Sequence, residues 1–86
     1  NPIGTEGARL IAGSENFKNL KLLDLYETEL GDEGGRALAE SKYLSNLETL
    51  ILIHNDISEK VQELIQNSKN LPNLTKVVFR PAMAEH

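Results

Sequence analysis

The chain has 86 residues and no cysteine, and with 9 basic and 13 acidic side chains its formal net charge is −4. This length allows one small domain, the lack of cysteine excludes disulfides and thiolate metal sites, and the acidic balance disfavours nucleic acid as a partner. The longest apolar runs have only a few residues, far below the roughly 20 that span a bilayer, and no signal-peptide pattern is present. We therefore expect no membrane partner and favour a cytoplasmic location.

Within each part of the chain, the spacing of apolar residues changes from helical to strand-like. In chain order this predicts a helix over 5–14, a strand with Leu23 and Leu25, a helix over 32–42, a strand with Leu50 and Leu52, a helix over 58–68, and a strand with Val77 and Phe79. Thr5, Asp32 and Ser58 stand where a side-chain oxygen can cap each helix. Short links between parallel strands and helices predict repeated right-handed crossovers, with strands inside a curved stack and helices outside.

A period of 27 residues relates these elements to one another without a gap. The clearest copies of one segment are 19–25, 46–52 and 73–79. A repeat of this length is typical of a solenoid, whose units bury their apolar faces by stacking on one another. We divide the chain into repeats of about 1–27, 28–54 and 55–81. Because Asn1 falls in the middle of a repeat, we expect residues 1–86 to be a single segment, cut from a longer array or processed.

Each helix is expected to turn one face toward the core. The residues predicted on that face are Gly7, Leu10, Ile11 and Ser14, then Gly34, Ala37, Leu38 and Ser41, then Val61, Leu64, Ile65 and Ser68. Small residues recur there, and we expect them to let the helices approach the strand layer closely; they are Gly7, Ala8, Gly34, Gly35 and Ala37. Nearly complete burial is predicted for Leu23, Leu25, Leu50, Leu52, Leu64 and Ile65. Ile51 and Ile53 should stay accessible, because neighbouring strand residues point to opposite faces.

The strand regions carry a recognisable motif. Its copies are Leu20-x-x-Leu23-x-Leu25-x-x-Thr28-x-Leu30, Leu47-x-x-Leu50-x-Leu52-x-x-Asn55-x-Ile57 and Leu74-x-x-Val77-x-Phe79. This pattern resembles the leucine-rich repeat signature, and the period with the run Gly31–Ala39 is similar to the ribonuclease-inhibitor-like class. The resemblance implies an α/β leucine-rich-repeat solenoid, a horseshoe segment with short parallel strands on the concave face and helices on the convex face.

The resemblance also implies a ladder of asparagines that hydrogen-bond the backbone between turns. This ladder maps onto Asn1 and Asn55, with Thr28 as a smaller substitute. The third repeat departs from the pattern, because Pro81, Ala82 and Ala84 occupy the turn. Proline cannot donate to a strand ladder, so the regular stack is expected to end near Arg80.

Catalytic and metal-binding chemistry finds little support in the residues. His54 has no histidine or cysteine partner for a metal set, and a solvated turn residue is the simpler interpretation. The glycine-rich run 31–35 lacks the lysine of a phosphate loop, which favours packing between repeats. Asn73 reads as a glycosylation acceptor, yet its counterparts Asn19 and Asn46 carry no such motif, so structure is preferred. The acidic group could be a cation site, but helix capping explains it better; its members are Glu27, Glu29, Asp32 and Glu33.

The remaining candidate is the sheet face turned away from the core. Strand alternation places nine residues there: Leu22, Asp24, Tyr26, Thr49, Ile51, Ile53, Lys76, Val78 and Arg80. Five of them are aliphatic or aromatic and would form one patch, with acid at Asp24 and Glu27 facing base at Lys76 and Arg80. We interpret the chain as a non-catalytic module that binds a protein partner on the concave face, without a cofactor, and self-association through the patch or the stack ends is expected. The alternative is a structural or regulatory spacer within a larger enzyme or secreted effector, whose patch makes intramolecular or oligomer contacts.

Overall fold

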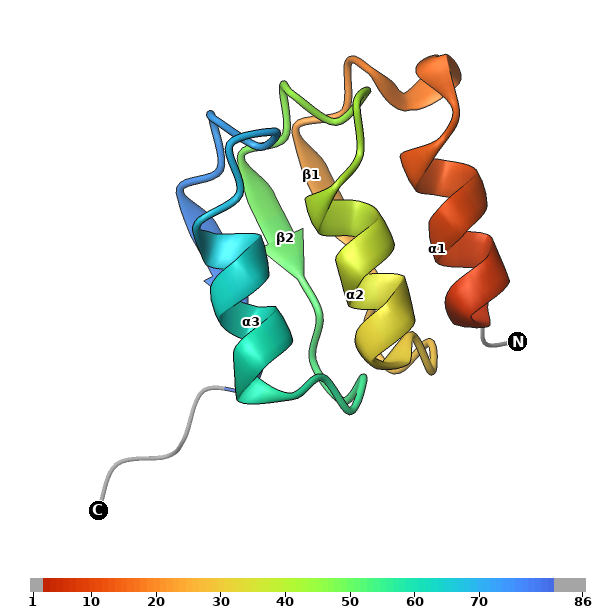
Figure 1. The fold of residues 1–86 in the computed structure, drawn as a ribbon, viewed down its shortest axis with the longest axis vertical. Coiled ribbons are helices and arrows are strands. Elements are labelled where there is room, and N and C mark those ends of the chain that lie inside the picture. The colour runs from red at the N-terminus through yellow and green to blue at the C-terminus, as the bar shows by residue number, and fades with distance from the viewer. Residues whose placement is uncertain (1–2, 82–86) are drawn as a thin grey trace.

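Three helices cover one face of a three-stranded parallel sheet in the computed structural model, which describes residues 3–81 (Figure 1). The elements in chain order are α1 (Gly4–Ala12), a 3₁₀ turn η1 (Glu15–Phe17), β1 (Leu22–Asp24), α2 (Gly31–Ala39), β2 (Thr49–Ile51), α3 (Glu59–Gln66) and β3 (Lys76–Val78). Each 27-residue stretch therefore contributes one helix followed by one strand. This arrangement confirms the predicted mixture of parallel strands and helices, and no helix within residues 3–81 is long and apolar enough to cross a membrane.

The strand register reproduces the sequence period. The sheet order is β1-β2-β3, and the paired positions are Leu22 with Thr49 and Lys76, Leu23 with Leu50 and Val77, and Asp24 with Ile51 and Val78. Each partner is 27 residues from the last, so equivalent side chains line up across the sheet. Equivalent side chains of the repeats therefore form continuous rows, some inside the molecule and some on its surface.

The helix starts differ from the capping prediction at two of three places. Ser58 caps α3 as expected, since its side chain accepts from the Val61 N–H. Thr5 and Asp32 make no cap: the Thr5 hydroxyl donates to Leu30 O at 2.9 Å, and Asp32 accepts from the Ser58 N–H at 2.7 Å. Both contacts reach into the following repeat, so these polar side chains join neighbouring repeats instead of closing their own helix.

The first residue of both α1 and α2 is a glycine. Gly4 and Gly31 both have φ of +65°, a conformation that costs glycine little. Their N–H groups donate to the next repeat, Gly4 to Thr28 O at 2.7 Å and Gly31 to Asn55 O at 3.0 Å. The positive φ favours glycine at both positions, whereas the third copy, Ser58, has φ of −68° and caps its helix in the ordinary way.

The core follows the strand prediction and departs from one helix prediction. Leu23, Leu25, Leu50, Leu52 and Ile65 are buried as expected, whereas Ile51 and Ile53 are half-buried. Leu64 is 41 % exposed, so its predicted burial is wrong. Leu64 lies on the side of α3 that faces α2, where it lines a shallow groove with Ala39 and Glu40.

The equivalent position in α1 is more exposed still. Leu10 is 71 % exposed, and no helix precedes α1 within residues 3–81 to cover it. The buried helix positions are instead Ala8 and Ala12 in α1, Gly34, Gly35, Leu38 and Ala39 in α2, and Val61 and Ile65 in α3. The buried stripe is thus turned by about one residue from the one that the spacing of Leu10, Ala37 and Leu64 suggests.

The closest neighbours of Gly34 and Gly35 are not strand residues, which corrects the predicted contact with the strand layer for these two glycines. A Cβ added to Gly34 would lie 2.9 Å from Leu30 Cβ and 3.4 Å from Ala8 Cβ. A Cβ added to Gly35 would lie 2.8 Å from a methyl group of Val61. Gly34 therefore serves the contact of α2 with α1, and Gly35 serves its contact with α3.

Polar side chains at equivalent positions of the repeats form hydrogen bonds from one repeat to the next. Asn55 is buried, and its Oδ1 accepts from the Thr28 N–H at 2.9 Å and the Leu30 N–H at 3.1 Å, while its Nδ2 donates to Leu25 O at 2.6 Å. This confirms the predicted ladder contact at Asn55. Thr28, one period earlier, places its hydroxyl 3.0 Å from Leu25 O. Asn1 lies outside the described residues, as do Ala82 and Ala84.

Two further registers repeat the same type of contact. The hydroxyls of Ser41 and Ser68 donate to the last residue of the preceding helix, Ala12 O and Ala39 O. The side-chain amides of Asn46 and Asn73 donate to Lys18 O and Ser45 O, at 2.9 and 2.8 Å. Asn73 thus has the structural role that the comparison with its counterparts predicted.

Candidate partner-binding surface

The sheet face opposite the helices carries the nine predicted residues, and we call it the open face. The strand register aligns two rows, Leu22 with Thr49 and Lys76, and Asp24 with Ile51 and Val78. Tyr26, Ile53 and Arg80 each follow two residues after the end of a strand and form the third row by the sequence period. Strand alternation is visible in the burial of β1, where Leu23 is buried between exposed Leu22 and Asp24. The structure therefore pairs the six members that lie within the strands in the predicted register.

The centre of the open face is apolar. Leu22 is 55 % exposed and Tyr26 is 49 % exposed, although both are large hydrophobic side chains. Ile51, Ile53 and Val78 are half-buried beside them. Adjacent strands lie about 4.8 Å apart, so these five side chains form a continuous patch, unlike Leu10 and Leu64, which α2 separates on the helical side.

Charges flank this centre with opposite signs on opposite strands. Asp24 is exposed on β1, while Lys76 is exposed on β3 and Arg80 just beyond it. The Asp24 carboxylate also accepts the Tyr26 N–H at 3.1 Å, which fixes the start of the turn. The open face thus runs from acidic, through apolar, to basic in the direction across the strands.

Tyr26 is held in place by a neighbouring aromatic ring. Its ring and that of His54 have centroids 5.4 Å apart and planes at 78°, an edge-to-face contact. His54 is exposed in the turn after β2, in the position predicted for a solvated histidine. The pair extends the open face toward the turns.

These turns require an uncommon backbone conformation. Glu27, Glu29, His54 and Asp56 have φ between 54° and 61°, at two equivalent positions of the first two turns. Pro81 follows one period after His54, and the proline ring fixes φ near −65°. The third turn therefore cannot copy the first two, in keeping with the prediction that regularity ends near Arg80.

The acidic group does not assemble into a cation site. Asp32 accepts the Ser58 N–H, and this hydrogen bond is the main cause that holds the pKa of its carboxyl below its usual value. Glu33 pairs with Arg9 at 2.8 Å across the α1–α2 groove. No cluster of three or more His, Cys, Asp or Glu side chains suited to a metal ion occurs within residues 3–81. Two of the four carboxylates are thus occupied by contacts between repeats.

The glycine-rich run 31–35 likewise has a packing role. Its first N–H is already bonded to Asn55 O, and an added Cβ would crowd Leu30 at Gly34 and Val61 of α3 at Gly35. A phosphate-binding loop needs such N–H groups to be free. The predicted preference for packing between repeats is therefore supported by these contacts.

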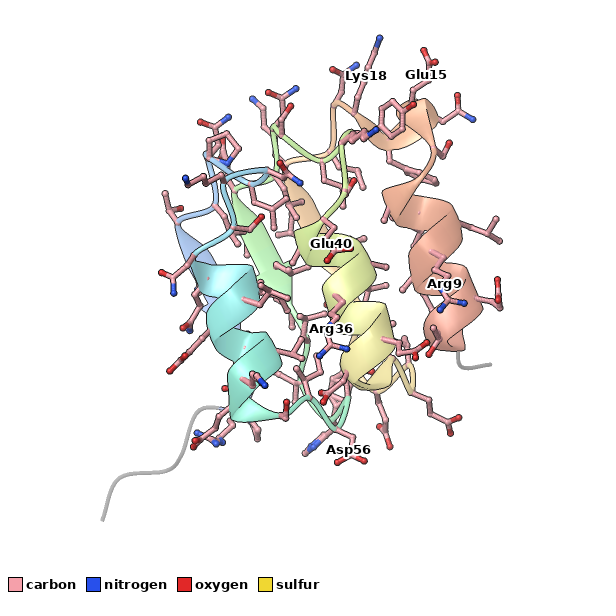
Figure 2. All side chains as sticks on the ribbon, in the orientation of Figure 1. Arg9, Glu15, Lys18, Arg36, Glu40 and Asp56 are labelled. Atoms are coloured by element: carbon pink, nitrogen blue, oxygen red, sulfur yellow. The ribbon has the colours of Figure 1, made fainter. Side chains whose placement is uncertain are left out.

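The helical side offers a different kind of surface. Figure 2 shows Arg9 on α1 with Arg36 and Glu40 on α2, all on this side of the molecule. These long charged side chains line the α1–α2 groove, where Arg9 is paired with both Glu6 and Glu33. The exposure of Leu10 and Leu64 was missed in the sequence, because the same spacing fits a buried stripe. Their isolation leaves the open face as the better candidate.

A comparison with known families gives one match. Residues 18–39 match the family model described as leucine-rich repeat, a stretch that contains β1, the following turn and α2. No curated protein matches the chain. The family match supports a leucine-rich repeat protein, and such repeats generally mediate protein–protein interaction and are typically non-catalytic.

Proposed function

We propose that this chain is a non-catalytic interaction module that binds a protein partner on its open face. In this proposal the chain is a segment of a ribonuclease-inhibitor-like solenoid, and the open face is the concave side of that stack. The 27-residue register of the strands, with one helix per repeat, supports this class. The family match over residues 18–39 supports protein binding as the general role.

The observation that carries the proposal is the exposure of Leu22 and Tyr26 beside three half-buried aliphatic residues. Apolar side chains scattered singly need no explanation, but a contiguous patch with a charged rim is typical of a protein interface. Aromatic residues and arginine are enriched among the residues that dominate binding energy. Tyr26 and Arg80 supply both, at opposite sides of the patch.

The test is a selection of binding peptides from a random phage-displayed library on the immobilised folded chain. We expect enriched peptides whose binding is lost with Ile51→Lys/Ile53→Lys and retained with the helical-side control Leu64→Lys. Circular dichroism should show that both variants keep the helical signal. Peptides that bind the Ile51→Lys/Ile53→Lys variant as well as the wild type, or no enrichment at all, would overturn the proposal and favour the spacer alternative.

A further inference from the structure

We propose that the open face is self-complementary and that a second copy of the chain binds it in a two-fold symmetric dimer. In this dimer β2 faces β2, and Asp24 of each copy lies against Lys76 and Arg80 of the other. The inference rests on the proposed function, because it takes the open face to be an interaction surface. It adds to the proposed function that one binding partner of the open face is a second copy of the chain.

The order of charges across the strands is the first reason. The face runs from acid on β1, through isoleucines on and just after β2, to bases on and after β3. When this pattern is reversed and laid against itself, acid meets base and the apolar centre meets the apolar centre. Two-fold symmetric contacts require such self-complementarity. If one residue contacts a second residue on the other copy, the second residue also contacts the copy of the first.

The same charges select the direction of the symmetry axis. An axis parallel to the strands places β1 of one copy over β3 of the other, so that Asp24 lies diagonally between Lys76 and Arg80. An axis across the strands would place β1 over β1 and Asp24 over its own copy, where like charges repel. The strand register aligns Asp24 with Val78, and Val78 lies two residues along the chain from each base. Of these two axes, only the first therefore pairs each acid with two bases.

The contacts near the axis and at Tyr26 are favourable, whereas Leu22 comes opposite Lys76. Ile51 and Ile53 meet their own copies at the axis and remove the most central apolar surface from water. Arg80 comes opposite Tyr26, where a guanidinium can lie on the aromatic ring. Two sheets pack in this aligned manner about 10 Å apart, at an angle of roughly 30°. Three strands about 4.8 Å apart span only about 10 Å, so the two faces can meet over their full width.

The size of the face sets the expected strength. The open face has nine residues, whereas a stable interface has roughly 20–30 residues on each side. We therefore expect a weak dimer, with a dissociation constant of about 10 to several hundred micromolar. Because the charged contacts are exposed at the rim, added salt should weaken the dimer further.

The test is charge reversal followed by mixing, measured by sedimentation equilibrium from about 10 µM to about 1 mM, the range set by the expected affinity. Asp24→Lys alone and Lys76→Asp/Arg80→Asp alone should each weaken dimerisation by about tenfold or more, because each homodimer then places like charges together. A mixture of the two variants should form a heterodimer within about threefold of the wild-type affinity, since both of its charged contacts are again attractive. Recovery on mixing also shows that the variants are folded.

Glu40→Lys on the helical side is the matched control, because it makes the same change in charge as Asp24→Lys. It should leave the dimer unchanged. A wild-type chain that stays monomeric across the whole range overturns the inference, as does a dimer that tolerates Asp24→Lys or a mixture that fails to recover. If the monomeric chain still selects peptides on the open face, the proposed function stands while the second copy is excluded as the occupant.

Discussion

Truncation of Asn55 to alanine should lower the stability of the fold strongly, although it removes only a few atoms. Asn55 is 2 % exposed and satisfies two backbone donors of the preceding turn, the Thr28 and Leu30 N–H groups. No other acceptor is within hydrogen-bond distance of either donor in the described structure. Asn55→Ala would therefore leave both N–H groups without a protein partner.

The expected loss follows from the burial of the two donors. A buried donor left unsatisfied costs about 1 to 3 kcal/mol. The bond to Leu30 is buried and the bond to Thr28 is only partly buried, so water can replace the second more readily. We expect Asn55→Ala to lower the free energy of unfolding by about 2 to 4 kcal/mol. That is a large part of the stability of so small a domain, for which roughly 5 kcal/mol is the lower end of the usual range.

Thr28→Ala is the matched control, since Thr28 stands one period before Asn55. Its hydroxyl contact with Leu25 O is backed by the Asn55 amide, which donates to the same oxygen. Thr28→Ala should therefore cost only about 0.5 to 1.5 kcal/mol. Urea unfolding followed by circular dichroism measures both variants. Equal losses of unfolding free energy in the two variants would refute the view that Asn55 makes the main polar contact between these repeats.

Three further predictions use the same unfolding assay. Leu50→Ala, at a fully buried position, should cost about 2 to 5 kcal/mol, and Ile51→Ala on the open face less than about 1; similar losses would contradict the assigned strand faces. Gly35→Ala should cost about 1 to 3 kcal/mol, because the new methyl meets Val61, and Val61→Ala should offset part of it in the double variant; additive losses would show that the two do not interact. The folded-state pKa of Asp32 lies below its unfolded value, so its stabilisation is present above the unfolded pKa and lost as pH falls through the folded one. The stability difference between wild type and Asp32→Asn should shrink below about pH 4, and a difference independent of pH would exclude this carboxylate as the cause.

The sequence period predicted most of the fold because it equals the strand register. Once Leu23, Leu50 and Val77 are aligned by the repeat, the parallel order of the strands and the two faces of the sheet follow. The pairing of the six open-face residues that lie within the strands was predictable for this reason. Their role in binding a partner stays a prediction, since burial and exposure describe the free chain.

The helical layer was harder to predict, because the helices pack against neighbouring helices as well as against the strand layer, and α2 has a helix on both sides. Spacing of 3.6 residues per turn allows two adjacent stripes, and the apolar residues Leu10 and Leu64 favour the wrong one. Thr5 and Asp32 were likewise expected to act within their own helices. Their partners are 25 and 26 residues away, and a local capping rule contains no information about a neighbour at that distance.

The three repeats differ in which equivalent positions keep their residue and which do not. Interior rows keep the same or a similar residue, as in Leu23, Leu50 and Val77, or in the serine row of Ser41 and Ser68 that bonds the preceding helix. The three rows of the open face never repeat a residue: Leu22, Thr49 and Lys76; Asp24, Ile51 and Val78; Tyr26, Ile53 and Arg80. Packing within the stack thus leaves the choice of these residues open. Exposure alone would favour polar side chains, yet five of the nine are apolar and the charges are sorted by strand. A surface that binds another protein accounts for both features, which is why the charge-reversal pairs are the sharpest way to examine it.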